Sequence, residues 1–297
     1  AIREGEIKTF DGKDGYVSMN QIVHKINIGH ITDIHFAILE LVNQFEFITS
    51  RQLYQMLEIK GIDAKSQDKL NNKLEALVKS KILTRYYFTS EEGKGIYRIY
   101  CLEKMGKYLL NSKEIECKWQ PSDNTKPVPM IKKRLAGNQT LIAYLRKVKA
   151  FDDFVVKPSL TAKTAGKVFK ATGGSVKLTK NKKSIQFLFE VIRREPDWKK
   201  KLVEKMRLYQ DFYANFVPGD SGFSTMPQLI FVCEDEKHMA ETFKEIITNQ
   251  VEIPQLKLYF TTDLRQNEET LENTLVEFKL VDGKYKMENI ELKLLGM

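Results

Sequence analysis

The stretch "SIQFLFEVIRREPDWKKKLVEKMRLYQDFY", residues 184–213, decides the fold of the C-terminal half of the chain. Its first residues form a short apolar run, which is typical of a buried strand. The basic segment that follows carries apolar residues at helical spacing and predicts an amphipathic helix over residues 197–216. One carboxylate, Glu190, lies near the end of the apolar run. The stretch therefore predicts a strand and a helix, and it raises the question of whether Glu190 has a chemical role.

The segments around this stretch predict a mixed arrangement of strands and helices. A strand over 175–179 and a strand over 184–191 form a hairpin through the turn "KNKK". The other predicted elements are a helix over 137–151, strands within 151–159, 228–233 and 256–262, a helix over 235–249 and a closing hairpin over 277–294 with a "DG" turn. The C-terminal part is therefore predicted to be an α/β domain.

The N-terminal part predicts three helices followed by a hairpin. Apolar residues at a 3.6-residue period give a helix over 31–47, and Thr49 or Ser50 can cap a second helix. Ser66 can cap a third helix, and two β-rich runs within 82–102 form the hairpin before a last helix. This order is that of a winged helix-turn-helix domain, which we assign to residues 1–117.

In a winged helix the third helix enters the major groove, where Asn and Gln can pair with adenine through two hydrogen bonds. Glu91 and Glu92 at the wing tip argue against close phosphate contact there. A winged helix that contacts only protein is the alternative. The predicted DNA-binding residues of this domain are Ser66, Gln67, Lys69, Asn71, Asn72 and Lys73 on the helix, and Lys94 and Arg98 on the wing.

Positive charge is concentrated in the middle of the chain. Residues 131–207 hold 21 Lys or Arg and 6 Asp or Glu, a net charge of +15, whereas the whole chain has a net charge of +9. Such a block predicts binding to a polyanion, with double-stranded DNA as the partner; a solvated lysine-rich surface is the alternative. The predicted phosphate contacts in this block are Arg193, Arg194, Lys199, Lys200 and Lys201.

Residues 118–133 contain three of the 8 prolines and predict an extended linker, which leaves 134–297 as the second domain. The 3 cysteines lie far apart and form no CxxC pair, which indicates neither a disulfide framework nor a zinc site. The N-terminus lacks an apolar signal region, and the chain has no long apolar run. These features predict a cytoplasmic protein with no membrane partner.

The order of elements in the second domain resembles the restriction-endonuclease-like fold. Taken with the winged helix, the chain resembles the plasmid replication-relaxation family of mobile-element proteins over about residues 31–262. The resemblance implies a DNA-binding head, a nuclease-like second domain and a role in plasmid or conjugative-element replication or transfer. The segments that carry it are "AILELVNQFEFITSRQLYQML", "NKLEALVKSKIL", "FLFEVIRR", "KMRLYQDFY" and "LKLYFTT".

The residues that a nuclease of this fold requires are incomplete. Such an enzyme carries an acid on each strand of the hairpin and a Lys two residues after the second acid, and the acids hold Mg²⁺. The strand over 175–179 has no acid, and the nearest acids upstream are Asp152 and Asp153. Glu190 matches the second acid, but the lysine position holds Ile192. We therefore predict a domain without catalysis, metal or cofactor.

Glu190 has one of two roles, depending on whether the domain is active. If the domain is active, Glu190 is the metal ligand and Lys205 supplies the missing lysine. If it is inactive, Glu190 is a strand-end carboxylate paired with Arg193, Arg194 or Lys205. For an exposed pair of this kind, Glu190→Gln is expected to cost at most about 1 kcal/mol.

The sequence therefore predicts an α+β protein with an N-terminal winged helix-turn-helix domain and an α/β restriction-endonuclease-like domain. The predicted function is sequence-specific binding of double-stranded DNA in the replication, transfer or regulation of a plasmid, conjugative element or phage. Homodimerisation and contact with a protein of the replication or transfer machinery are further partner predictions. The alternatives are an active metal-dependent DNA endonuclease and a ligand-responsive transcriptional regulator.

Overall fold

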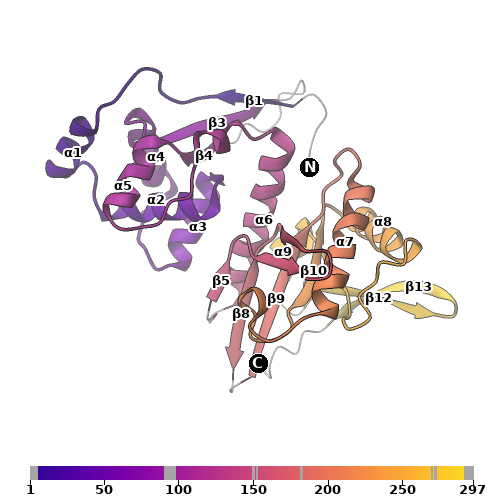
Figure 1. Cartoon of the computed structure of the whole chain (residues 1–297). Helices are drawn as coiled ribbons and strands as arrows, with labels where there is room; N and C mark the ends of the chain where they lie inside the picture. The colour runs from indigo at the N-terminus through magenta and orange to yellow at the C-terminus, as the bar shows by residue number, and fades with distance from the viewer. Residues whose placement is uncertain are drawn as a thin grey trace. The chain divides into compact units, whose positions relative to one another are not determined.

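The chain is a mixed α+β protein that divides into two compact units, Ile2–Leu135 and Ala136–Met297 (Figure 1). The computed structural model describes residues 6–89, 98–148, 151, 153–180, 183–268, 270 and 273–290. Within these residues, no helix combines the length and the apolar composition that a bilayer crossing requires.

The first unit combines helices with one small antiparallel sheet. Its strands are β1 (Ile7–Phe10), β2 (Ile48–Thr49), β3 (Leu83–Thr89) and β4 (Arg98–Leu102), in the order β1-β3-β4-β2. Its helices are α1 (Met19–Asn27), α2 (Asp33–Phe45), α3 (Ser50–Ile59), α4 (Gln67–Lys79) and α5 (Lys104–Ser112), with a 3₁₀ turn η1 at Pro121–Thr125. The predicted helices and hairpin strands of this unit are all present, whereas β1 and α1 were not predicted.

Side-chain caps fix where α3 and α4 begin. The hydroxyl of Thr49 accepts a hydrogen bond from the backbone N–H of Gln52, and the hydroxyl of Ser66 accepts one from the N–H of Lys69. These bonds satisfy N–H groups that have no partner within the helix. α4 then buries Leu70 and Leu74 toward the core of the unit. The cap and the apolar spacing together leave the polar residues of α4 outward.

The prediction of an extended linker over residues 118–133 is wrong in its secondary structure. η1 lies inside this segment, and α6 (Val128–Lys147) begins before the segment ends. A proline in the first turn of a helix loses no hydrogen bond, because the N–H groups there have no helical partner, so Pro129 is tolerated. Ile131 and Leu135 of α6 then join a buried cluster that includes Phe47 and Phe88.

The second unit contains a seven-stranded mixed sheet in the order β13-β12-β11-β10-β9-β8-β5. β9, β10 and β11 run parallel, and the other neighbours are antiparallel. The strands are β5 (Asp153–Val155), β8 (Ser175–Lys180), β9 (Lys183–Val191), β10 (Gln228–Cys233), β11 (Tyr259–Thr262), β12 (Leu275–Val281) and β13 (Lys284–Ile290). This sheet contains the strands predicted for the second domain.

The other elements of this unit are helices and one small sheet. The helices are α7 (Trp198–Ala214), α8 (Glu236–Thr248), α9 (Asp263–Glu268) and the 3₁₀ turn η2 (Asp220–Gly222). β6 (Ser159–Ala162) and β7 (Lys167–Lys170) form a separate two-stranded sheet, which was not predicted. The long helices α7 and α8 agree with their predicted positions.

Helices cover both faces of the sheet in the second unit, as the alternation of side chains along β9 shows. Leu188 lies in the buried cluster that α7 and α8 build with β10 and β11. Phe189 points to the opposite face, where its ring lies 4.5 Å from the ring of Tyr144 in α6. Because successive strand residues point to opposite faces, Glu190 lies on the same face as Leu188, toward α7. A carboxylate is thereby placed inside an apolar layer.

Candidate functional site

Glu190 lies at the centre of a buried polar cluster. Its side chain is 1% exposed. The Nζ of Lys205 donates to Oε1 at 2.7 Å, and the hydroxyl of Tyr209 donates to Oε2 at 2.8 Å. Thr172 donates from its hydroxyl to Oε1 at 2.9 Å and from its N–H to Oε2 at 3.3 Å. Both carboxylate oxygens are therefore occupied by protein donors.

The geometry of the cluster follows from the sequence of α7. Lys205 and Tyr209 are four residues apart, so they lie on one face of the helix, the face turned toward Glu190. Thr172 comes from the segment that leads into β8, and its hydroxyl also accepts a hydrogen bond from the N–H of Val191 at 2.9 Å. The cluster thus links the end of β9, the start of the hairpin and the middle of α7.

Burial and the neighbouring carboxylate act together on Tyr209. Desolvation, followed by the negative charge of Glu190, raises the pKa of the Tyr209 phenol well above its ordinary value. The phenol therefore stays protonated and donates its hydrogen bond to Glu190 at neutral pH. A buried carboxylate with a lysine, a phenol and a threonine as donors is a stable structural arrangement, because its charge is paired and its oxygens are satisfied.

The cluster does not have the composition of a Mg²⁺ site. No group of three or more His, Cys, Asp or Glu side chains that could hold a metal ion occurs among the described residues. Asp153 is an exposed residue of β5, which pairs with β8 and not with β9. Asp152 lies outside the described residues. A single carboxylate that already accepts from an ammonium group offers little negative charge to a divalent ion.

The ion pair of Glu190 is not exposed, so the condition for a cost of at most about 1 kcal/mol is not met. The predicted partner Lys205 is the one that binds Glu190, and the lysine side chain is 21% exposed while the carboxylate is 1% exposed. The pair is buried because α7 packs directly over the end of β9. Removal of one partner from such a pair leaves the other charge without compensation, so the cost exceeds that of a surface pair.

The predicted phosphate contact by Arg193 is also wrong. Its side chain is 4% exposed, and its guanidinium pairs with Asp263 at 2.7 Å. The same group donates to the carbonyl oxygens of Ile192 at 2.8 Å and Val232 at 3.3 Å. Arg193 therefore joins β9, β10 and α9 inside the second unit, and its donors are turned away from solvent.

The remaining basic residues of this region differ in how far they are neutralised. Arg194 pairs with Asp235 at 2.5 Å, and with Glu234 and Glu241 at longer distances. On α7, the side chain of Lys199 binds Glu245 at 2.6 Å, and that of Lys201 binds Glu195 at 3.5 Å. Lys200 is exposed and has no carboxylate partner among the residues that the structure describes.

α4 presents a different surface. Lys69, Asn71 and Asn72 are exposed, and Lys73 is half-buried. The amide nitrogen of Gln67 donates to the Oδ1 of Asn71 at 3.2 Å and to the carbonyl of Ser50 in α3 at 3.3 Å. Ser66 acts as the helix cap. Three of the six predicted residues are thus exposed, Gln67 and Lys73 are half-buried, and Ser66 lies at the start of the helix.

The two residues predicted on the wing have different outcomes. Arg98 of β4 is exposed, and its Nε donates to the Oδ2 of Asp11 at 3.2 Å. Asp11 also binds Arg85 at 2.8 Å. Lys94 lies outside the described residues, as do Glu91 and Glu92. In the described part of the predicted wing, Arg98 is therefore exposed and shares the carboxylate of Asp11 with Arg85.

Thr172, Tyr209 and Asp263 were not predicted to contact the candidate site residues. For Tyr209 a signal was present, because its four-residue spacing from Lys205 places both side chains on one helical face. Thr172 and Asp263 depend on how distant segments meet in space, for which the sequence pattern carries no comparable signal.

Comparison with known proteins gives no relative for this chain: no family model, no curated protein and no solved structure matches it.

Proposed function

We propose that the chain is a sequence-specific double-stranded-DNA-binding protein whose first unit is a winged helix-turn-helix domain. The observation that carries the proposal is the outward face of α4, where Lys69, Asn71 and Asn72 are exposed on a helix held by a cap and a buried leucine stripe. The order α2, α3, α4, β3, β4 is the order that a winged helix requires.

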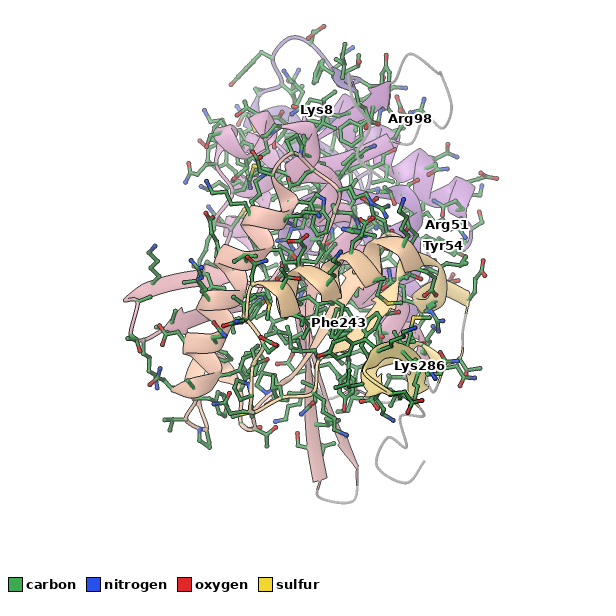
Figure 2. The ribbon with its side chains drawn as sticks, turned by 90° about the vertical axis from the view of Figure 1, so that its right-hand side faces the viewer. Lys8, Arg51, Tyr54, Arg98, Phe243 and Lys286 are labelled. Carbon is green, nitrogen blue, oxygen red and sulfur yellow. The ribbon has the colours of Figure 1, made fainter. Side chains whose placement is uncertain are left out.

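The side chains on this face have the chemistry of base and phosphate recognition. An asparagine amide can both donate to and accept from adenine in the major groove, and a lysine ammonium can contact phosphate. The hydrogen bond from Gln67 to the carbonyl of Ser50 connects the starts of α4 and α3. Arg51 and Tyr54 of α3 in the first unit, labelled in Figure 2, lie at exposed and half-buried positions respectively.

For the second unit we propose a nuclease-like domain without catalysis. The hairpin β8–β9, the crossover helix α7 and the parallel strand β10 follow the element order expected for that fold. The proposal of inactivity is supported by the two oxygens of Glu190, which accept from Lys205, Tyr209 and Thr172. Both oxygens of this carboxylate are therefore already hydrogen-bonded within the protein.

The biological role that fits these two proposals is replication, transfer or regulation of a plasmid, conjugative element or phage. Together, the two proposals describe a protein that binds a specific DNA site and does not cleave the DNA. Such a protein would recruit or position other components at that site, which makes a protein of the replication or transfer machinery the expected second partner.

Two assays on the full chain test the proposal together. Fragmented genomic DNA is captured on the immobilised protein and sequenced, and supercoiled plasmid is incubated with the protein and Mg²⁺ or Mn²⁺. We expect enrichment of a short common sequence and intact plasmid. Capture without any sequence preference would contradict specific reading. Metal-dependent cleavage that disappears in Glu190→Gln would instead make Glu190 a metal ligand.

A further inference from the structure

The hairpin of β12 and β13 has one apolar face that the second unit only partly covers. Cross-strand partners place Phe278 opposite Met287, and Leu280 opposite Tyr285. Directly opposed residues of an antiparallel pair lie on the same face, so these four side chains form one patch. Leu280 is 63% exposed, Tyr285 49% and Met287 42%. The outer part of the hairpin therefore presents large apolar side chains to solvent.

α8 covers only the base of this patch. The ring of Phe243 stacks on Phe278 at a centroid distance of 4.2 Å and meets the ring of Tyr285 at 4.9 Å. Figure 2 labels Phe243 on α8 and Lys286 on the hairpin. β12 pairs with β11 only at Phe260 and Val276, so the rest of the hairpin extends beyond the sheet, as Figure 1 shows. The exposed apolar residues lie in this extension.

β13 is also an edge strand. Among the described residues it pairs with β12 alone, and all but the last of its seven residues are exposed. On the charged face of the hairpin, Lys279 binds Glu277 at 2.8 Å and Glu288 at 2.7 Å. Lys286 lies opposite Lys279 and has no carboxylate partner among the described residues. An exposed strand edge with apolar neighbours is a surface that pairs readily with another strand.

We propose that this edge binds a second copy of the chain, through antiparallel pairing of β13 with its copy about a two-fold axis at Met287. In this register Lys286 of each copy lies opposite Glu288 of the other, twice by symmetry. Tyr285 lies opposite Asn289, and the two Met287 side chains meet on the axis. The apolar patches of the two copies then become one continuous face of a four-stranded sheet.

Neighbouring symmetric registers are less favourable. A shift that centres the pairing on Lys286 places two like charges on the axis, and a shift that centres it on Glu288 does the same. Directly opposed like charges destabilise a strand pair, whereas opposite charges stabilise it. The pattern lysine, methionine, glutamate at 286–288 is therefore self-complementary in the register about Met287, and this complementarity is what favours a second copy over an unrelated partner.

The test is a charge exchange read out by sedimentation velocity of the full chain over a range of concentrations. Lys286→Glu places Glu opposite Glu288 of the other copy, and we expect the dimer Kd to rise by about tenfold. Within one copy the same change places Glu opposite Lys279, so folding is preserved. Lys286→Glu with Glu288→Lys restores opposite charges and is expected to restore the dimer. Lys284→Glu is the matched control, because Lys284 lies opposite the uncharged Ile290.

Three results would overturn the proposal: a wild-type chain that stays monomeric throughout, a dimer that Lys286→Glu leaves unchanged, or a double exchange that fails to recover dimerisation. A dimer that is weakened equally by Lys284→Glu would also overturn it, since net charge would then explain the effect. Because the measurement contains no DNA, its outcome is independent of the proposed DNA binding.

Discussion

α4 and α7 both carry several lysines, but the lysine side chains of the two helices differ in how many of them are paired with carboxylates. On α4, the side chains of Lys69 and Asn72 are exposed and have no hydrogen-bond or carboxylate partner among the described residues. On α7, Lys199 and Lys201 are exposed but bound to Glu245 and Glu195. Lys205 is drawn inward to Glu190. Similar residue types are thus available for a partner on one helix and are largely paired on the other.

The difference shows that net charge over a segment overstates its affinity for a polyanion. Residues 131–207 have a net charge of +15, but several of their cations bind carboxylates from the acidic C-terminal part of the chain. A lysine that must release a carboxylate before it contacts phosphate gains less from that contact. α4, with few basic residues, is therefore the stronger candidate for DNA recognition.

Among the predicted variants, Glu190→Gln should reduce the free energy of unfolding most, because it breaks the buried pair between β9 and α7. Glu190→Gln removes the buried carboxylate charge that accepts from Lys205 and Tyr209. We expect the free energy of unfolding to fall by about 3 kcal/mol, at the lower end for a broken buried pair because the lysine is partly exposed. Chemical denaturation measures it. Lys199→Ala, which breaks an exposed pair, is the control and should change stability much less.

A stability loss from Glu190→Gln no larger than that from Lys199→Ala would mean that burial of the pair contributes little. The distinction drawn between α7 and α4 would then lose its energetic basis.

The next effect concerns His238 of α8, which lies against Trp198 of α7 at a ring-centroid distance of 4.7 Å. Burial, assisted by the charges of Arg194 and Arg193, lowers the pKa of His238 to about 4. The unfolded chain therefore binds a proton between about pH 6.5 and pH 4 that the folded chain does not bind. The contribution of neutral His238 to the free energy of unfolding should be complete above about pH 6.5. The free energy of unfolding should then fall by about 3 kcal/mol as the pH approaches 4.

Thermal or denaturant unfolding at several pH values checks this dependence. His238→Gln should flatten the stability profile over this pH range. His24→Gln is the control, because His24 is exposed on α1 and should leave the profile unchanged. An unaltered profile in His238→Gln would assign the acid sensitivity to other groups.

The smallest effect compares neighbouring lysines on α7. Lys200→Ala should reduce the slope of log affinity against log salt by about 1, as expected for the loss of one phosphate contact. Lys199→Ala should change the slope less, since Lys199 is held by Glu245. The measurement is binding of the full chain to a random duplex at several salt concentrations. Equal changes in the two variants would show that pairing with a carboxylate does not limit DNA contact.

Local signals in the sequence located most elements of the fold. The spacing of Leu70 and Leu74 and the cap at Ser66 predict α4, and both features are present. Ser18 and Gln21 form a capping box for α1, and this local signal is also present in the sequence. The strands β6 and β7 are short and rich in exposed residues, so their apolar alternation is too weak to identify them.

Long-range pairing explains what the sequence did not reveal about the candidate site. Arg193 and Asp263 lie 70 positions apart, and their ion pair joins the segment after β9 to the start of α9. The burial of Glu190 depends on α7 lying across the end of β9. The sequence could place Lys205 as one of three partners for Glu190, but the choice among them is made by the register of the sheet and the position of the helix.

Comparison of wild type with Asn71→Ala/Asn72→Ala tests most directly whether α4 reads DNA. The measurement is the affinity for the enriched sequence relative to a random duplex, with Asn111→Ala, an exposed asparagine on α5, as the control. We predict that the double variant loses about 1–3 kcal/mol of discrimination for each lost two-bond contact, while its unfolding is unchanged. A double variant that discriminates as well as wild type would contradict reading of the sequence by α4.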